Sequence, residues 1–344
     1  MTEETTTIST ACKKSVVLMS KMARAHSQEI PLKFKKACNS FIQHLGKTKE
    51  DFDDVSADFP QAYLKKIAKC IFQISLSPYT YGSKQSRNVI LSLLNALLSS
   101  TLMEQSQEVC AQLFLKNSSS KGKSNDVQHS IQLIRMGCTM VSSWKKSKTQ
   151  DTITAVTSCQ TTVLTQLLEN ISTLQDSSSS SLAMQGYTST AFTKAIQSSS
   201  NAIKEEIWRL MEETPNRRFA GVYALMILGG KATKARGMAL FVSHVLEGPG
   251  ALSNATVQAF VPLYKMFESS DMTTTFGNAL SVALKRRQET IVPVLSTVLA
   301  SMPKSVDLSS SCHALLFDPI VEYWRKKSDG MMGDGDLARM TSVS

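Results

Sequence analysis

The segment at residues 219–302 constrains the fold more than any other part of the chain, because apolar helical segments follow one another there with only short breaks. Residues 219–228 are apolar on every side, so a helix there must be covered by neighbours on more than one face. The sequence around Pro262 recurs around Pro293, with an amphipathic segment between the two. Two helices per repeat explain this spacing, and such a unit buries its apolar face only by stacking on others. We therefore predict an all-α fold, an α-solenoid of helical hairpins.

Composition agrees with helices rather than strands. Nine prolines and fifteen glycines are few for 344 residues, and no alternating apolar and polar run is bounded by Asn-Gly or Asp-Gly turns. Helical spacing also predicts one long segment at residues 187–213, kinked at Ser198–Ser200, and a last helix from about Ser310 to Lys326. The apolar positions of that last helix are Ala314, Leu315, Phe317, Ile320 and Trp324.

Two polar, serine-rich segments interrupt the helical pattern, and a third polar segment closes the chain. Such compositions do not order themselves by burial, so they mark loops and linkers. The expected organisation is N-terminal helical repeats at 1–116, a flexible loop at 117–125, a helical hairpin at 126–174, a Ser-rich linker at 175–186, C-terminal helical repeats at 187–327 and a disordered tail at 328–344.

The chain carries a net charge of +10, which favours an anionic partner such as RNA or an acidic protein face. Basic residues lie in small groups that a solenoid can align along one edge. We expect contacts from Lys65, Lys66, Lys69, Arg286 and Arg287. The competing interpretation is that each group is an ordinary solvated helix face or helix end.

Seven cysteines are widely spread and form no C-x-x-C pair, which indicates a reducing compartment with buried thiols rather than a disulfide framework or a zinc site. The amino terminus lacks the pattern of a signal peptide, and no apolar run approaches the length of a membrane span. We therefore expect a cytosolic protein without a membrane partner.

No catalytic constellation is present in the sequence. The five histidines are scattered without metal-ligand spacing, and the pair Gly230-Lys231 lacks the earlier glycine and the Ser or Thr of a phosphate-binding loop. We predict no enzymatic activity, no cofactor, no metal and no small-molecule substrate.

Several segments resemble one protein family in order and spacing. They lie at residues 218–226, 259–267, 278–286 and 289–301, with weaker similarity at 64–72 and 86–94. The family is the stalled-ribosome sensor called general control non-derepressible protein one, a very large HEAT-repeat protein that activates the amino-acid-starvation kinase of initiation factor 2 alpha. The resemblance implies HEAT-like helical hairpins and a scaffold that binds translating or collided ribosomes. The matching positions are mostly core, so no site residues are carried over.

The resemblance also sets a limit. This chain is far shorter than members of the family and lacks both the part similar to an elongation factor and the segment that engages the kinase. The expected function is a non-catalytic scaffold that binds the ribosome, both its RNA and its proteins, and acts with the translation-control proteins of the starvation-kinase pathway. The alternative is a general protein–protein adaptor or transport-type solenoid that takes a partner helix on a concave apolar face.

Overall fold

The structure is a computed structural model of the chain. It describes residues 17, 61–78, 80, 83–99, 103–119, 127–144, 156–176, 182–214, 217–228, 234–248, 263, 270–300 and 310–331. Apart from Val17, the first half of the N-terminal repeats predicted at 1–116, residues 1–60, lies outside these residues, and so do Pro262 and residues 177–181 of the predicted Ser-rich linker.

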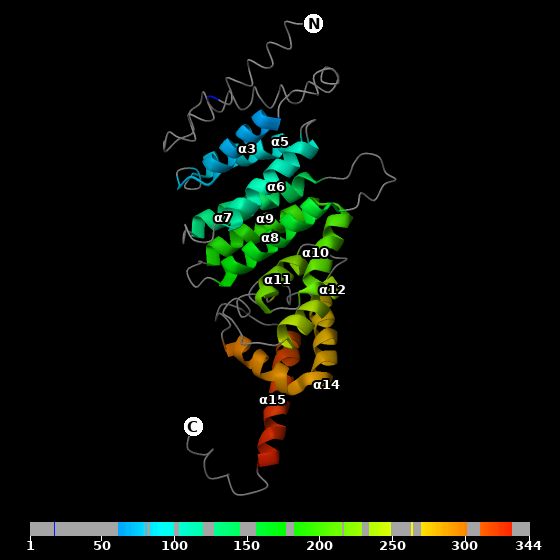
Figure 1. Cartoon of the computed structure of the whole chain (residues 1–344). Coiled ribbons are helices and arrows are strands. Elements are labelled where there is room, and N and C mark those ends of the chain that lie inside the picture. The colour runs from blue at the N-terminus through cyan, green and yellow to red at the C-terminus, as the bar shows by residue number, and fades with distance from the viewer. Residues whose placement is uncertain are drawn as a thin grey trace. The chain divides into compact units, whose positions relative to one another are not determined.

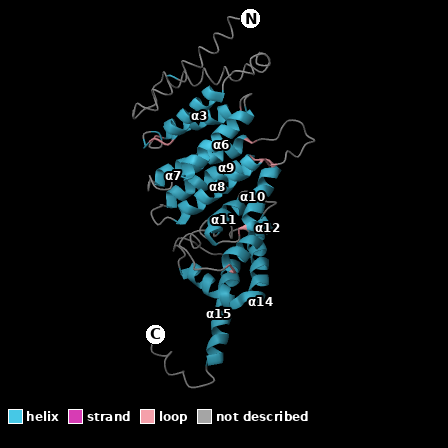
Figure 2. Cartoon of the chain, in the orientation of Figure 1, coloured by secondary structure: helices cyan, strands magenta, loops and turns pink. Residues whose placement is uncertain are grey.

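Within the described residues every regular element is helical, which confirms the predicted all-α class. Eleven α-helices, one 3-10 turn and one π-helical turn are present in that part of the chain, and Figure 2 draws no strand there. The contacts between helices divide the chain into two compact units, with the division between Leu210 and Met211. Each unit is described by itself.

Unit 1 consists of helices that contact one another in a regular order. Its members are α3 (Gln61–Ser75), α5 (Lys84–Leu98), α6 (Met103–Ser119), α7 (Val127–Ser143), α8 (Ser158–Asp176), α9 (Leu182–Ser198) and most of α10 (Asn201–Glu213). α3 contacts α5 and α6, α5 contacts α7, and α7 contacts α9 (Figure 1). α3 and α5 therefore each pack both on the next helix in the chain and on the helix after it.

Side-chain hydrogen bonds join α8 to α6 and to α10 in unit 1. The Asn170 amide of α8 donates to the Ser118 hydroxyl of α6 at 3.0 Å, and the Thr161 hydroxyl of α8 donates to a Glu206 carboxylate oxygen of α10 at 2.7 Å. Contacts of this kind link α6, α8 and α10 in turn.

A serine caps the start of α5. Ser83 has an extended backbone, and its hydroxyl accepts a hydrogen bond from the Ser86 N–H at 3.4 Å, which caps the start of α5. The apolar face of α5 is buried except at Val89, which is half-buried. Its buried residues are Ile90, Leu93, Leu94, Leu97 and Leu98.

Unit 2 is built around α11 (Ala220–Leu228), which follows a 3-10 turn, η1 (Arg217–Phe219). Every residue from Phe219 to Ile227 is buried, which confirms that this segment is covered on more than one face. The unit continues with α12 (Lys234–Phe241), the π-helical turn η2 (Val242–Leu246), α14 (Ser270–Ala300) and α15 (Ser310–Met331). α12 contacts α11 and α14, and α14 contacts α15.

Some predicted bounds differ from those of the structure. The long segment at 187–213 is two helices, because the chain leaves the helical path at Ser199-Ser200 and the Ser200 hydroxyl accepts from the Ile203 N–H at 3.3 Å as α10 begins. α6 continues to Ser119, inside the predicted loop at 117–125. α9 starts at Leu182, inside the predicted linker at 175–186, and α15 reaches Met331, inside the predicted tail at 328–344.

None of the five apolar positions predicted for the last helix is buried: Ala314 and Trp324 are exposed, and Leu315, Phe317 and Ile320 are half-buried. Trp324 was assigned to the apolar face of the last helix, but its side chain is 46% exposed. The reason is that helical spacing reports a shared face and not what covers it. Among the side chains of α15 that the structure describes, only that of Leu316, near the start of the helix, is buried.

Candidate nucleic-acid interface

α3 carries the first group of predicted contact residues on its outward face. Leu64, Ile67 and Ala68 are at most 2% exposed and turn one face of the helix inward, whereas Lys65, Lys66 and Lys69 are exposed. α3 contains no aspartate or glutamate. Lysines four residues apart on a helix are neighbours and repel each other, so an anion bound between Lys65 and Lys69 relieves that repulsion.

α14 carries the second group at a bend. Lys285, Arg286 and Arg287 are all exposed, and Arg287 has a non-helical backbone with φ −144° and ψ 51°, so α14 is two helical segments joined at this residue. The basic side chains therefore lie where the first segment ends. Cations are favoured at the carboxyl end of a helix, so this position also suits the helix dipole.

The two groups belong to different units, since α3 lies in unit 1 and α14 in unit 2. Each is therefore a basic surface in its own right. The prediction that the groups align as one strip along the molecule stays a prediction.

α15 presents a third basic group, which carries an aromatic partner that sequence reasoning missed. Arg325, Lys326 and Lys327 are exposed, and they follow directly on Tyr323 and the exposed Trp324. The signal available in the sequence was this succession of two aromatic and three basic residues, a combination typical of surfaces that bind single-stranded nucleic acid. Assigning Trp324 to the core concealed it.

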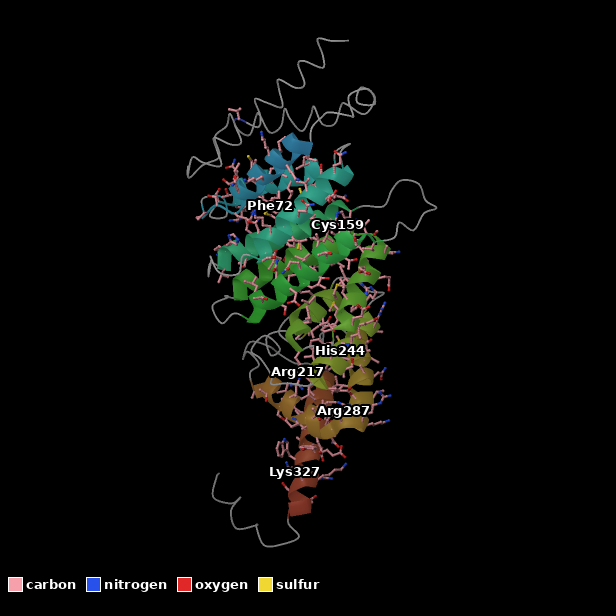
Figure 3. All side chains as sticks on the ribbon, in the orientation of Figure 1. Phe72, Cys159, Arg217, His244, Arg287 and Lys327 are labelled. Atoms are coloured by element: carbon pink, nitrogen blue, oxygen red, sulfur yellow. The ribbon has the colours of Figure 1, made fainter. Side chains whose placement is uncertain are left out.

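Unit 2 also contains a polar cluster, formed by Tyr223, His244 and Arg217. The Tyr223 hydroxyl donates to the Met211 carbonyl at 2.8 Å, and the Tyr223 ring lies 5.8 Å from the His244 ring. Figure 3 labels His244 together with Arg217, whose guanidinium donates to the Leu246 carbonyl at 3.4 Å. The first of these hydrogen bonds ties α11 to the end of α10, and the second ties η1 to η2.

The ionisation of this cluster supports a structural role. Burial lowers the pKa of His244, with the Glu212 carboxylate acting in the opposite direction, and burial raises the pKa of Tyr223 well above its ordinary value. The Ser243 hydroxyl lies 3.4 Å from Nδ1 of His244 but donates to the Leu240 carbonyl at 3.2 Å. In this arrangement the serine proton is directed at a backbone carbonyl rather than at the histidine.

The thiols are placed for packing. Cys70, Cys110 and Cys138 are buried and reduced, and Cys159 is half-buried. Burial raises the pKa of both Cys110 and Cys138 to about 12, so neither is a reactive thiolate near neutral pH. Among the residues that the structure describes, no group of three or more His, Cys, Asp and Glu side chains is positioned to hold a metal ion.

Comparison with protein-family models, with curated proteins and with solved structures finds no match for this chain. None of the helices in the described part of the chain combines the length and the apolar character needed to cross a bilayer. The case for a function therefore depends on the surfaces described above.

Proposed function

We propose that this chain is a non-catalytic α-solenoid of HEAT-like helical hairpins that binds the ribosome through its basic surfaces. The packing of unit 1 supports the first part. α5, α7 and α9 contact one another in succession, and α3, α6, α8 and α10 are linked in succession by helix contacts and by hydrogen bonds. Two such rows are what stacked helical hairpins produce.

The observation that carries the binding proposal is the outward face of α3. Its three exposed lysines project from a helix without acidic residues, in a chain with a net charge of +10. Ribosomal RNA presents phosphates at high density, and lysines bind phosphate as point charges. Arg286 and Arg287 of α14 supply a second surface, in unit 2, for the same kind of contact.

The resemblance described under Sequence analysis gives the proposal its biological setting. A cytosolic scaffold of this kind acts in translational control during amino-acid starvation, together with proteins of the starvation-kinase pathway. Binding to the ribosome is the part of this proposal that the chain's own residues support, so it is the part to test first.

The test is co-sedimentation of the full chain with purified ribosomes over a range of salt concentrations. We expect binding at low salt that weakens steeply as salt rises, with each neutralised phosphate contributing roughly 0.7–0.9 to the slope of log K against log salt. The double variant Lys65→Ala/Lys69→Ala should weaken binding and reduce that slope by roughly 1–2. Absence of co-sedimentation even at low salt would contradict the proposal.

A matched control removes the same charge from elsewhere in unit 1. Lys116 of α6 and Lys194 of α9 are exposed, and neither belongs to the basic groups of α3, α14 or α15. The variant Lys116→Ala/Lys194→Ala therefore tests net charge alone. Equal losses in the two double variants would show that α3 holds no specific contact.

A second candidate function is a protein–protein adaptor. The observation that favours it is a pair of exposed apolar side chains, Val282 of α14 at 51% and Val321 of α15 at 62% exposed. Partners held by apolar contacts survive high salt, whereas phosphate contacts do not. Capture of a defined partner at high salt, without ribosomal proteins, would favour this function over the first.

A further inference from the structure

The second half of α15 presents its side chains to solvent. Leu316 is 2% exposed, but from Asp318 to Asp329 every side chain is exposed or half-buried. Figure 3 labels Lys327 in this half of the helix. The aromatic side chains of this segment are therefore accessible to a ligand.

Trp324 is unlike the other tryptophans. Trp144 is 5% exposed and Trp208 is fully buried, so Trp324, at 46%, is the one exposed indole among the three in the chain. Its ring lies 5.4 Å from the Tyr323 ring in an edge-to-face arrangement, with an interplanar angle of 80°. Such a pair orients the indole, because edge-to-face packing is favoured by the ring quadrupoles.

A lysine is positioned against both rings. The ammonium of Lys327 lies 5.2 Å from the centre of the Trp324 ring and 6.0 Å from that of Tyr323, within the range of cation–π attraction. The adjacent Lys326 points elsewhere and forms an ion pair with Glu322 at 2.8 Å. Two neighbouring lysines therefore differ in role, since one is held at the aromatic rings and the other is neutralised by a carboxylate.

We propose that Trp324 and Lys327 form a binding site for an unpaired base of single-stranded RNA. The base stacks on the accessible part of the indole, and a phosphate beside it contacts Lys327. Stacking on an aromatic ring with a cation beside it is how sequence-tolerant proteins hold single strands. This inference deepens the proposed function and rests on it, because it names unpaired RNA as what α15 contacts.

The chemistry favours a single strand over a duplex or a protein. In a duplex both faces of each base are stacked on neighbours, so the indole finds no free base. An acidic peptide without aromatic side chains satisfies Lys327 but gives the indole no flat partner. An unpaired nucleotide uses the ring and the cation together.

The test is a titration of the full chain with a twelve-residue oligouridine, followed by tryptophan fluorescence. Because Trp144 and Trp208 are buried, quenching by the oligonucleotide reports on Trp324. We expect quenching that saturates with oligouridine and weakens with added salt, and no quenching with the same length of double-stranded RNA. Quenching by polyglutamate but not by oligouridine would overturn the inference in favour of an acidic protein partner.

Variants locate the site. With fluorescently labelled oligouridine and anisotropy as the readout, Trp324→Ala is expected to weaken binding about tenfold, and Trp324→Phe less, because an aromatic face remains. Lys327→Ala should weaken binding several-fold, whereas Lys326→Ala, its matched control with the same change in charge, should leave it nearly unchanged. Equal effects of the two lysine variants, or an unchanged affinity for Trp324→Ala, would overturn the inference. Circular dichroism checks that each variant keeps its helix content.

Ribosome co-sedimentation separates this inference from the proposed function. If the chain binds ribosomes but oligouridine neither quenches nor binds, the α15 site is wrong and ribosome binding stands. If oligouridine binds in a Trp324-dependent way but ribosomes do not co-sediment, the site stands and the ribosome is not the source of the RNA.

Discussion

The side-chain amide of Gln132 donates a hydrogen bond to the Ser75 hydroxyl at 2.9 Å, which joins α7 to α3 across 57 residues of sequence. Both side chains are fully buried, so this is a polar contact inside an otherwise apolar interface. The other polar atom of the amide, Oε1, has no hydrogen-bond partner among the described residues. Because the Ser75 hydroxyl accepts this hydrogen bond, replacing Ser75 leaves the buried Gln132 N–H without an acceptor, which costs stability.

We expect Ser75→Ala to lower the free energy of unfolding by about 1–3 kcal/mol, because it leaves the Gln132 N–H buried without an acceptor. Gln132→Met should lower it less, since the change also removes the carbonyl oxygen that lacks a partner. The double variant should lose less than the sum of the two. Urea denaturation followed by circular dichroism measures all three, and strict additivity would show that the two side chains are not coupled.

Gly137 of α7 marks a close approach of helices in unit 1. A Cβ atom there would lie 2.9 Å from Cδ1 of Leu167 and 3.0 Å from the Phe114 ring, and both neighbours are at most 1% exposed. We expect Gly137→Ala to destabilise the protein by about 1–3 kcal/mol, because the surrounding core has no room to yield. Thermal unfolding measures the loss.

Gly277 of α14 is the matched comparison. A Cβ there would approach only the end of the Leu315 side chain, which is half-buried and can change rotamer. The gain in helix propensity of about 1 kcal/mol offsets much of that adjustment, so Gly277→Ala should be close to neutral. A larger loss for Gly277→Ala than for Gly137→Ala would contradict this account of both sites.

Glu206 makes the folding stability of unit 1 depend on pH. The Arg209 guanidinium donates to both of its carboxylate oxygens, at 2.8 and 2.9 Å, and these hydrogen bonds, with that of Thr161, hold the pKa of Glu206 below its ordinary 4.5 despite partial burial. Because the folded-state pKa is the lower one, the stabilisation is present above the unfolded pKa and is lost as pH falls through the folded pKa.

Glu206→Gln should therefore lower stability by about 1 kcal/mol at pH 7 and flatten the decline of stability between about pH 5 and pH 3. The exposed neighbour Glu205 supplies the control, Glu205→Gln, which should leave that decline in place. Melting temperatures recorded across this pH range make the comparison. An unchanged pH profile in Glu206→Gln would show that the carboxylate is not linked to folding.

Cys159 should be the first to react among the four cysteines whose side chains the structure describes. It is half-buried, whereas Cys70, Cys110 and Cys138 are buried. Partial burial raises its pKa and the charge of Glu108 raises it further, so Glu108→Gln should speed its alkylation by N-ethylmaleimide roughly twofold at pH 8 by increasing the thiolate fraction. Mass spectrometry of peptides after timed labelling gives the rate for each thiol. Faster labelling of Cys110 or Cys138 than of Cys159 would contradict the burial described here.

Much of the fold follows from the periodicity of apolar residues, and the helix boundaries that were predicted wrongly have physical causes. Residues 219–227 are buried on all sides because a segment without a polar face has no surface to offer water. At Ser199-Ser200 the sequence predicted a kink, whereas the structure has the end of one helix and the start of another. Serine can either sit inside a helix or cap a new one, and only the surrounding packing selects between the two. The same ambiguity placed helix ends inside predicted loops at Ser119 and Leu182.

Some features of the candidate surfaces were likewise recognisable in the sequence, and others were not. The lysines of α3 were recognisable as an outward face because the apolar residues between them define the inward one. The position of Arg287 at a bend of α14 was not recognisable, since its backbone angles depend on how the two halves of the helix pack. Nor was the exposure of Trp324, because an apolar stripe looks the same in sequence whether or not a neighbour covers it.

The sequence by itself determined that this chain is helical, where its apolar faces lie and which helices carry unbalanced positive charge, because these properties follow from the identity and spacing of nearby residues. Only the tertiary structure decided which faces meet, such as Gln132 on Ser75, and which stay open to solvent, such as Trp324 beside Lys327. The physical reason is that burial is a property of pairs of segments distant in sequence, and the periodicity of one segment does not identify its partner.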